Sequence, residues 1–326
     1  MTGLSITALL TIAMQGAAQA RPPLKLLNDF GPSVSAEWLH DHLNDPGLVV
    51  VQVGYHTREY DRGHIPGAYF LRHQDLAPEQ GRMAAEAPDP KQLMTVLAGA
   101  GIGEGARVVF YGEPMAAARA WATLDWFGLG DRAAVLDGGL GAWRRLDLPL
   151  SADVPVRGAT LPMRAGPAGP LVDTDWVAEH LRDTAIVLID ARPDDEYTGA
   201  DGGHGGAHLA GHIPGARQLY WEDLLVSTTD RRLRPRAELE ARFRRAGARR
   251  GKTLVVYCMI GLRASVVYHA ARLLGYDVRF YDGSWQEWSY RGLSVETGRP
   301  EPKRLPKRPA PAEELECSPA ARKAVG

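Results

Sequence analysis

The chain has 326 residues, of which 45% are hydrophobic and 24% charged, a composition typical of a soluble protein with two domains. Lysine and arginine total 38 against 39 aspartate and glutamate residues, so the formal net charge of -1 argues against nucleic acid as the main partner. The 2 cysteines are too few for a disulfide scaffold or a four-cysteine zinc site. Any role for a cysteine would therefore come from its reactivity.

Residues 1–20 contain no charged side chain, unlike the rest of the chain. An apolar stretch from Leu4 to Met14 precedes Ala18-Gln19-Ala20, whose small residues suit a signal-peptidase site, although no basic residue lies near Met1. The stretch is too short to span a bilayer, and no later segment resembles a membrane span. We expect a signal peptide over residues 1–20 and a periplasmic or secreted protein. The alternatives are a mis-chosen start codon or a disordered leader, with a cytoplasmic protein.

The remainder of the chain is an internal repeat. The sequence GHIPGA at residues 63–68 recurs at residues 211–216, and the segments around each copy match in the same order. Such repetition indicates two homologous domains. We place them at residues 24–150 and 171–298, joined by a linker over residues 151–170 that is rich in Pro, Gly and Ala. Residues 299–326 form a Pro-rich tail, for which we expect no core of its own.

Each repeat alternates short β-rich runs with helical patterns. The runs at residues 49–53 and 108–111 are continuous and β-branched, as in buried parallel strands, whereas residues 93–97 have helical spacing. The sequence therefore predicts an α/β fold of two domains, each a small parallel sheet with helices on both faces. Ligands of such sheets bind beyond the carboxyl ends of the strands, which directs attention to the residues after Tyr111 and Tyr257.

The two repeats differ in the segments that follow these tyrosines. Tyr257 precedes the sequence CMIGLR at residues 258–263 and then a helical pattern, whereas the equivalent stretch at residues 112–115 has no nucleophile. A thiol between a strand and a helix N-terminus faces free backbone N–H groups, which favour the thiolate. Gly261 permits a tight turn, and Arg263 adds a cation. The loop is suited to stabilise a sulfur anion; the alternative is an inert cysteine that ends a strand.

Together these features resemble the tandem-domain rhodanese family, the thiosulfate and 3-mercaptopyruvate sulfurtransferases. The resemblance rests on Asp190-Ala191-Arg192, the repeated motif at residues 211–216, the loop at residues 258–263 and the sequence DGSWQEW at residues 282–288. It implies an inactive first domain and a catalytic second one. It also implies that a Cys258 thiolate takes a sulfur from the donor as a persulfide and passes it to cyanide or a thiol. No metal or organic cofactor is implied, because the cysteine carries the sulfur.

The resemblance makes Cys258 the catalytic residue and Asp190 a supporting one. We expect the donor to be bound by the loop and by two cations, namely Met259, Ile260, Gly261, Leu262, Arg263 and Arg192. For Asp190 and Arg192, a plain structural ion pair is an equal alternative. The expected partners are a small anionic sulfur donor and a cyanide or thiol acceptor, with no nucleic acid and no membrane, and we expect a monomer.

The identity of the donor is less constrained than the reaction. Thiosulfate is our first choice, although Ile260 and Glu196 stand where thiosulfate-using relatives tend to carry cations. The alternative is 3-mercaptopyruvate, or a donor with a more apolar body that Met259 and Ile260 would suit. A phosphatase of the same fold needs five residues between its cysteine and arginine, and here four separate Cys258 from Arg263. A non-catalytic sulfur carrier or a redox-sensing module stays open.

Three further features are assigned no chemistry. His204, His208 and His212 are spaced for a metal on a helix, but the glycines among them argue against a helix, and we expect no metal site. The basic segment 231–252 is better explained as a solvated helix face than as a device that attracts anions. Cys317 lies in the tail, where a role as a resolving thiol is disfavoured.

Overall fold

The computed structural model describes residues 30–156, 169–201 and 209–299. The proposed signal peptide, His204, His208, Cys317 and almost all of the tail lie outside these ranges, as does most of the linker. In the described ranges, no helix is both long enough and apolar enough to cross a membrane.

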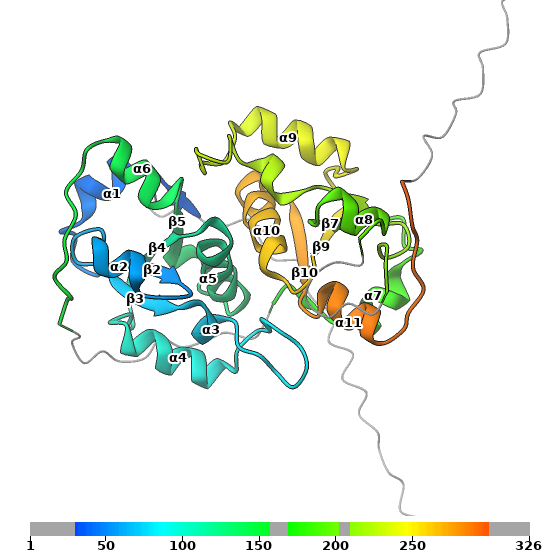
Figure 1. Ribbon diagram of the computed structural model, residues 1–326, viewed down its shortest axis with the longest axis horizontal. Helices are drawn as coiled ribbons and strands as arrows, with labels where there is room; N and C mark the ends of the chain where they lie inside the picture. The colour runs from blue at the N-terminus through cyan, green and yellow to red at the C-terminus, as the bar shows by residue number, and fades with distance from the viewer. Residues whose placement is uncertain (1–29, 157–168, 202–208, 300–326) are drawn as a thin grey trace, which may run out of the picture.

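The N-terminal domain is built on a sheet of five parallel strands in the order β1-β5-β4-β2-β3 (Figure 1). Helices α1 and α6 pack on one face of the sheet, and α4 and α5 pack on the other. The strands are β1 (Ser33–Val34), β2 (Leu48–Gly54), β3 (Tyr69–Arg72), β4 (Arg107–Gly112) and β5 (Ala133–Leu136). The helices are α1 (Ala36–His42), α2 (Arg58–Arg62), α3 (His73–Leu76), α4 (Pro90–Gly99), α5 (Pro114–Trp126), η1 (Gly130–Arg132) and α6 (Gly139–Arg145).

The C-terminal domain repeats this topology strand for strand, in the order β6-β10-β9-β7-β8. The predicted α/β fold of two parallel-sheet domains is confirmed. The strands are β6 (Leu171–Val172), β7 (Ile186–Asp190), β8 (Arg217–Gln218), β9 (Thr253–Tyr257) and β10 (Asp277–Tyr281). The helices are α7 (Thr174–His180), α8 (Asp194–Thr198), η2 (Trp221–Leu224), α9 (Arg236–Arg245), α10 (Leu262–Leu274) and α11 (Ser284–Tyr290).

The repeated GHIPGA motif makes the same buried contacts in both domains. His64 Nδ1 donates to the carbonyl of Tyr60 at 3.0 Å, and the two rings stack with centroids 3.8 Å apart. In the second copy His212 Nδ1 donates to the carbonyl of Tyr197 at 2.7 Å, with a ring separation of 3.9 Å. The contact persists although 4 positions separate the partners in the first copy and 15 in the second. Because the copy without a cysteine shares these contacts, they indicate a structural role for the motif.

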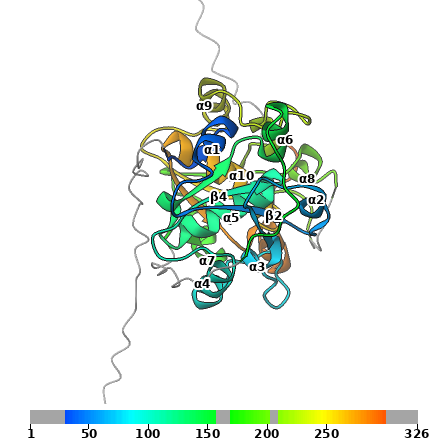
Figure 2. The same ribbon diagram turned by 90° about the vertical axis from the view of Figure 1, so that its left-hand side faces the viewer.

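The two domains are joined by the packing of α5 against α10, which lie side by side in Figures 1 and 2. One apolar cluster includes residues from both domains, so the interface continues the cores on either side. At the C-terminal end of α5, the buried Asp125 accepts a hydrogen bond from Tyr268 Oη at 2.6 Å. An oxygen of the same carboxylate lies 3.3 Å from Nε of Arg272. Asp125 and Arg272 form an interdomain ion pair that water barely reaches.

The buried pair provides the first test. Asp125→Asn keeps the volume of the side chain but leaves the Arg272 cation without an anion, and uncompensated buried charge is costly. We expect the free energy of unfolding in urea to fall by about 3 kcal/mol. Asp131→Asn, which alters an exposed carboxylate on η1, is the control and should change it by less than about 0.5 kcal/mol. Equal stabilities for the two variants would contradict this assignment.

Candidate active site

Cys258 follows β9, which has a paired strand on each side, and its side chain is fully buried. The backbone around it is held by the turn that starts α11. The Cys258 N–H donates to Ser284 Oγ at 3.3 Å, and the Cys258 carbonyl accepts from the Trp285 N–H at 2.9 Å. Ser284 itself has φ +53°, a strained conformation for a residue other than glycine. Ser284 therefore has a specific place under the loop, which the sequence indicated only as part of a family motif.

The loop from Cys258 turns into α10 at Gly261, as expected from the sequence. Gly261 has φ +84° and caps the 13-residue helix, and its carbonyl accepts from the N–H and Oγ of Ser265 at 3.2 and 3.0 Å. The first N–H groups of a helix have no acceptor within the helix, and they carry its positive dipole end. The thiol thus lies on the chain between a strand end and a set of donors that favour an anion.

Arg263 extends from the first turn of α10 to Glu196 of α8. Its Nη1 and Nη2 donate to the two carboxylate oxygens at 2.6 and 2.9 Å, and the side chains are 20% and 8% exposed. Burial lowers the pKa of Arg263, but the carboxylate of Glu196 and the nearby Cys258 offset this and raise it above its usual value. The loop cation is therefore close to the sulfur, but a carboxylate already neutralises much of its charge. From the sequence, Glu196 was notable only because it stands where thiosulfate-using relatives tend to carry a cation.

Asp190 and Arg192 form a buried pair beside the loop. Arg192 Nε lies 3.0 Å from each Asp190 oxygen, and Nη2 donates to Asp190 Oδ2 at 2.6 Å and to the carbonyl of Gly211 at 2.7 Å. Its guanidinium also lies 4.5 Å from the ring of Trp285. Burial lowers the pKa of Arg192, and Asp190 more than offsets this. These contacts favour the structural ion pair, and donor binding by Arg192 stays a prediction.

The apolar side chains of the loop point in different directions. Met259 is 3% exposed and packs in the apolar cluster that contains Trp285 and Trp288. Ile260 packs against the same cluster but is partly exposed, as is Leu262. Side-chain contact with a donor is thus open to Ile260 and Leu262, whereas Met259 would act through its backbone. The loop sequence alone could not show which side chains would be buried and which could contact a donor, because the direction of each side chain depends on the turn at Gly261.

The equivalent place in the N-terminal domain is closed. Gly112 ends β4 with φ +143°, and a Cβ on it would lie 2.1 Å from the carbonyl oxygen of Val53. Only Glu113 separates β4 from α5, and Pro114, the first residue of α5, has no N–H to offer an anion. The first copy thus lacks the nucleophile, the space for it and one of the donors.

A segment of the N-terminal domain lies against the turn that supports Cys258. The Ala84 N–H donates to Gln286 Oε1 at 2.9 Å, and the Ala87 N–H donates to Asp282 Oδ2 at 2.7 Å. Glu86 lies between Ala84 and Ala87 on the chain. Its burial, together with the negative charge of Asp282, raises its pKa to about 8. Glu86 is therefore protonated at neutral pH, beside the catalytic domain.

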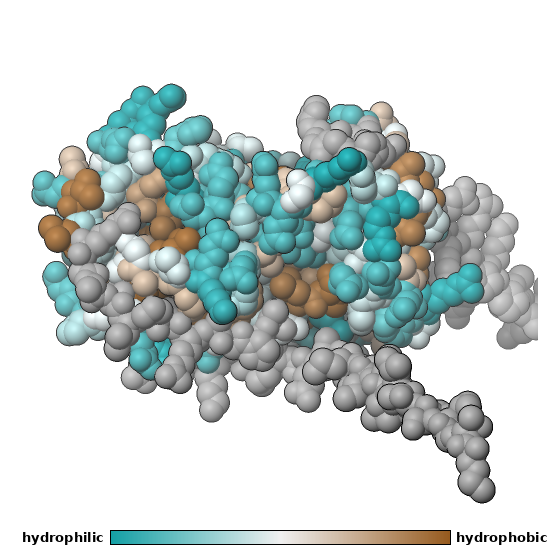
Figure 3. Space-filling view, turned by 90° about the horizontal axis from the view of Figure 1, so that it is seen from below, coloured by the Kyte–Doolittle hydropathy of each residue, from teal (hydrophilic) through white to brown (hydrophobic). Residues whose placement is uncertain are grey.

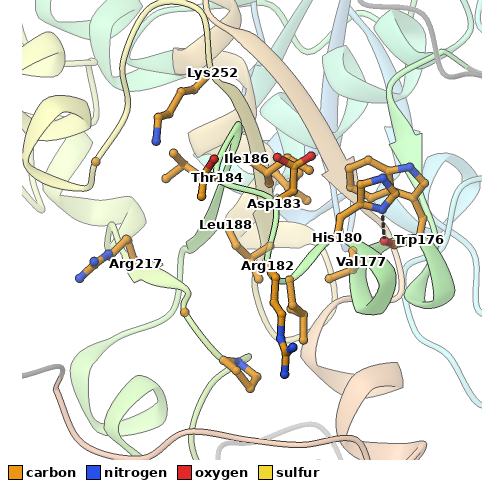
Figure 4. Close-up of a pocket in the computed structure, with 16 residues that line it drawn as sticks. Trp176, Val177, His180, Arg182, Asp183, Thr184, Ile186, Leu188, Arg217 and Lys252 are labelled. Atoms are coloured by element: carbon orange, nitrogen blue, oxygen red, sulfur yellow. Dashed lines mark hydrogen bonds between the residues drawn. The ribbon is translucent and has the colours of Figure 1, made fainter.

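A cavity of about 510 Å³ lies away from this site. It lies at the amino ends of β7 and β9, where Ile186 pairs with Thr253, and Cys258 is five residues further on, roughly 16 Å along the strand. Figure 4 shows Arg182, Arg217 and Lys252 around this cavity with their charged ends pointing apart. The cavity therefore does not present a converging set of cations to an anion.

Glu86 makes the interface sensitive to pH. The carboxyl ionises near pH 4.5 in the unfolded chain and near pH 8 in the folded one, so the folded state holds the extra proton and loses stability as the pH rises between these values. Glu86→Gln should therefore leave stability at pH 4.5 unchanged and raise it at pH 8 by about 1–2 kcal/mol, measured by urea unfolding. Glu79→Gln, at an exposed position, is the control. A gain that does not vary with pH would contradict the assignment.

Gly261 should tolerate no side chain. A Cβ there would require φ +84° and would lie 2.7 Å from Nη1 of Arg119, a buried residue of α5. We expect Gly261→Ala to lower kcat for the sulfur transfer that the sequence predicts by about a hundredfold, because a shift of about 1 Å in a reactive group has that effect. Gly251→Ala is the matched control, since Gly251 has φ +81° with nothing within 4 Å of its Cβ position. Similar losses in both variants would assign the effect to backbone strain alone.

Comparisons with known proteins agree with this architecture. The model of the rhodanese-like domain matches twice, at residues 35–146 and 173–291. The 3-mercaptopyruvate sulfurtransferase of Escherichia coli strain K12 is 31% identical over 281 residues, which are 81% of this chain and 97% of that protein. The thiosulfate sulfurtransferase of Corynebacterium glutamicum is 33% identical over 285 residues, which are 81% of this chain and 90% of that protein.

A sulfur carrier protein of Thermus thermophilus, TtuD, is 33% identical over 278 residues, which are 78% of this chain and 92% of that protein. Among solved structures, an anaerobic ergothioneine biosynthesis enzyme from Chlorobium limicola, in complex with trimethyl histidine, superposes with a TM-score of 0.75 at 26% identity. That match covers 85% of this chain and 73% of the other. With two matched domains and relatives of this kind, the chain belongs to the rhodanese family and is a sulfurtransferase with a tandem pair of rhodanese-like domains.

Proposed function

We propose that the protein transfers the outer sulfur of thiosulfate to a thiophilic acceptor, cyanide or a thiol, through a persulfide on Cys258. The position of Cys258 carries this proposal. It is the only cysteine in the described part of the chain, and it lies between the central strand β9 and the N-terminus of α10. Donors of a helix N-terminus on one side and Arg263 on the other suit a sulfur that is negative before and after each step.

The reaction needs no external oxidant or reductant. The Cys258 thiolate attacks the outer sulfur of thiosulfate, a new S–S bond forms, and the S–S bond of thiosulfate breaks with its electron pair leaving on sulfite. The acceptor then attacks the outer sulfur of the persulfide. The bond between the two sulfurs breaks, the electron pair returns to Cys258, and thiocyanate or a new persulfide leaves. These two half-reactions predict ping-pong kinetics.

The alternative donor is 3-mercaptopyruvate, and one observation favours it. Glu196 neutralises much of the charge of Arg263, so the loop has less positive charge for a dianion such as thiosulfate than the sequence of the loop suggests. Relatives of this chain carry the names of both activities. A sulfur carrier is a further candidate, because TtuD bears that name. A phosphatase is disfavoured, since the loop is one residue too short.

Sulfur loading tests the proposal directly. We expect the purified protein to gain the mass of one sulfur atom when incubated with thiosulfate and to lose it when cyanide is added, as followed by intact mass spectrometry. Cys258→Ser should gain nothing, whereas Cys317→Ser, outside the described residues, should load like the wild type. Values of kcat/KM for thiosulfate and 3-mercaptopyruvate then decide the donor. A wild-type protein that takes sulfur from neither compound would refute the proposal.

Location and assembly are part of the same proposal. Residues 1–20 lie outside the described ranges, and cleavage after Ala20 in a periplasmic or secreted protein is a prediction that N-terminal sequencing checks. On the face seen in Figure 3, hydrophilic side chains predominate and hydrophobic ones form separate areas. This face does not present the large continuous apolar surface that stable interfaces usually need, and a monomer is the state we propose, which sedimentation analysis checks.

A further inference from the structure

Arg119 is the buried cation of the N-terminal domain that lies nearest to the Cys258 loop. It projects from α5 and is fully buried against two aromatic rings that contact each other, with its guanidinium carbon 4.5 Å from the centre of the Trp126 ring and 5.5 Å from that of Phe280. Its Nη2 donates to the carbonyl of Ala85 at 2.5 Å and to Asp282 Oδ1 at 3.1 Å. These contacts place it at the junction of both domains.

Nη1 of Arg119 is directed at the catalytic loop. A Cβ built on Gly261 would lie 2.7 Å from this nitrogen. Among the residues that the structure describes, neither Nη1 nor Nε of Arg119 has a hydrogen-bond partner, although both atoms are buried. Buried donors of a charged group are nearly always paired, so this exception requires a reason.

The other two cations beside the loop are committed to carboxylates. Arg263 makes two hydrogen bonds to Glu196, and Arg192 is held by both oxygens of Asp190. Arg119 makes one hydrogen bond to a carboxylate, to Oδ1 of Asp282. The other oxygen of Asp282 accepts from a backbone N–H instead. Arg119 is thus the least neutralised of the three arginines around the loop.

Arg119 is also linked to Cys258 indirectly, through the turn that holds the backbone of Cys258. Asp282, its carboxylate partner, lies two residues before Ser284, whose Oγ accepts from the Cys258 N–H. One guanidinium therefore binds Asp282 in the turn and lies beside Gly261 in the loop. A shift of Arg119 would release both together.

We propose that Arg119, on the domain without a nucleophile, is a positioning residue for sulfur transfer, which holds the loop of Cys258 closed around the sulfur through Gly261 and Asp282. The proposal rests on the persulfide function of Cys258. It assigns the N-terminal domain a part in turnover, beyond support of the fold. A loop that loses this contact would hold the outer sulfur less well in each half-reaction, so the effect falls on kcat more than on donor binding.

Arg119→Met tests this in the full chain, because methionine fills space against the aromatic rings but has neither charge nor donors. We expect kcat for thiosulfate, or for 3-mercaptopyruvate if that is the donor, to fall about tenfold or more with KM changed less than about threefold. Arg119→Lys, which restores the charge without the planar fork, should recover part of kcat. Hydrogen exchange of the amides at residues 259–265 should accelerate in Arg119→Met.

Arg272→Met is the matched control. Arg272 is also a buried arginine in an ion pair between α5 and α10, but it lies ten residues beyond the start of α10, roughly 15 Å along the helix. We expect this variant to lose thermal stability while it keeps kcat within about twofold and exchange at residues 259–265 unchanged. Equal losses of kcat in the two variants, or a wild-type kcat in Arg119→Met, would overturn the proposal.

Two further outcomes are informative. If Arg119→Met does not fold, Arg119→Lys decides. A kcat of this variant reduced about threefold or more at unchanged KM supports a positioning role for Arg119. An unchanged kcat overturns that role. Sulfur loading separates this proposal from the general function. A wild-type protein that never gains sulfur refutes the persulfide function, whereas a wild type that loads and an Arg119→Met variant that loads and discharges at the same rates refute only the role of Arg119.

Discussion

The packing of α5 against α10 is the constraint on which the catalytic loop depends. Because α10 begins at Gly261, the position of this helix fixes where the loop ends, and α5 determines what lies behind it. The same contact buries the Asp125–Arg272 pair and places Arg119 against the loop. The environment of the thiol therefore depends on both domains, and changes in the part of α5 that lies against Gly261 should be felt at Cys258.

Much of the site follows from local order along the chain. A buried strand, a short loop with one glycine and a helix suffice to predict where Cys258 lies and that Gly261 takes a left-handed conformation. The neighbouring strand likewise predicts that Asp190 and Arg192 lie beside the loop, although not that each would use up the other's charge. The repeat predicts the topology of both sheets, because equivalent apolar runs occupy equivalent positions in them.

What the sequence could not indicate are contacts between distant segments that depend on the final packing. Arg119 lies in the copy without a nucleophile, and its one signal on the chain is that it is the only charged residue between Glu113 and Asp125, which does not show what it contacts. The sequence showed that Glu196 stands where thiosulfate-using relatives tend to carry a cation. It could not show that Glu196 pairs with Arg263, because that contact depends on the angle at which α8 meets α10. The burial of Met259 depends in the same way on the turn at Gly261. Each case is a side-chain direction set by tertiary structure.

The closed loop of the N-terminal domain bears on the history of the duplication. A cysteine at position 112 would place its Cβ 2.1 Å from a backbone oxygen, and the segment before α5 is too short to form a cradle of the kind that follows β9. No single substitution can therefore return a thiol to this copy, since the backbone itself would have to be rebuilt. The first domain thus excludes a thiol at this place through its backbone, while its helix α5 serves as the packing partner of α10.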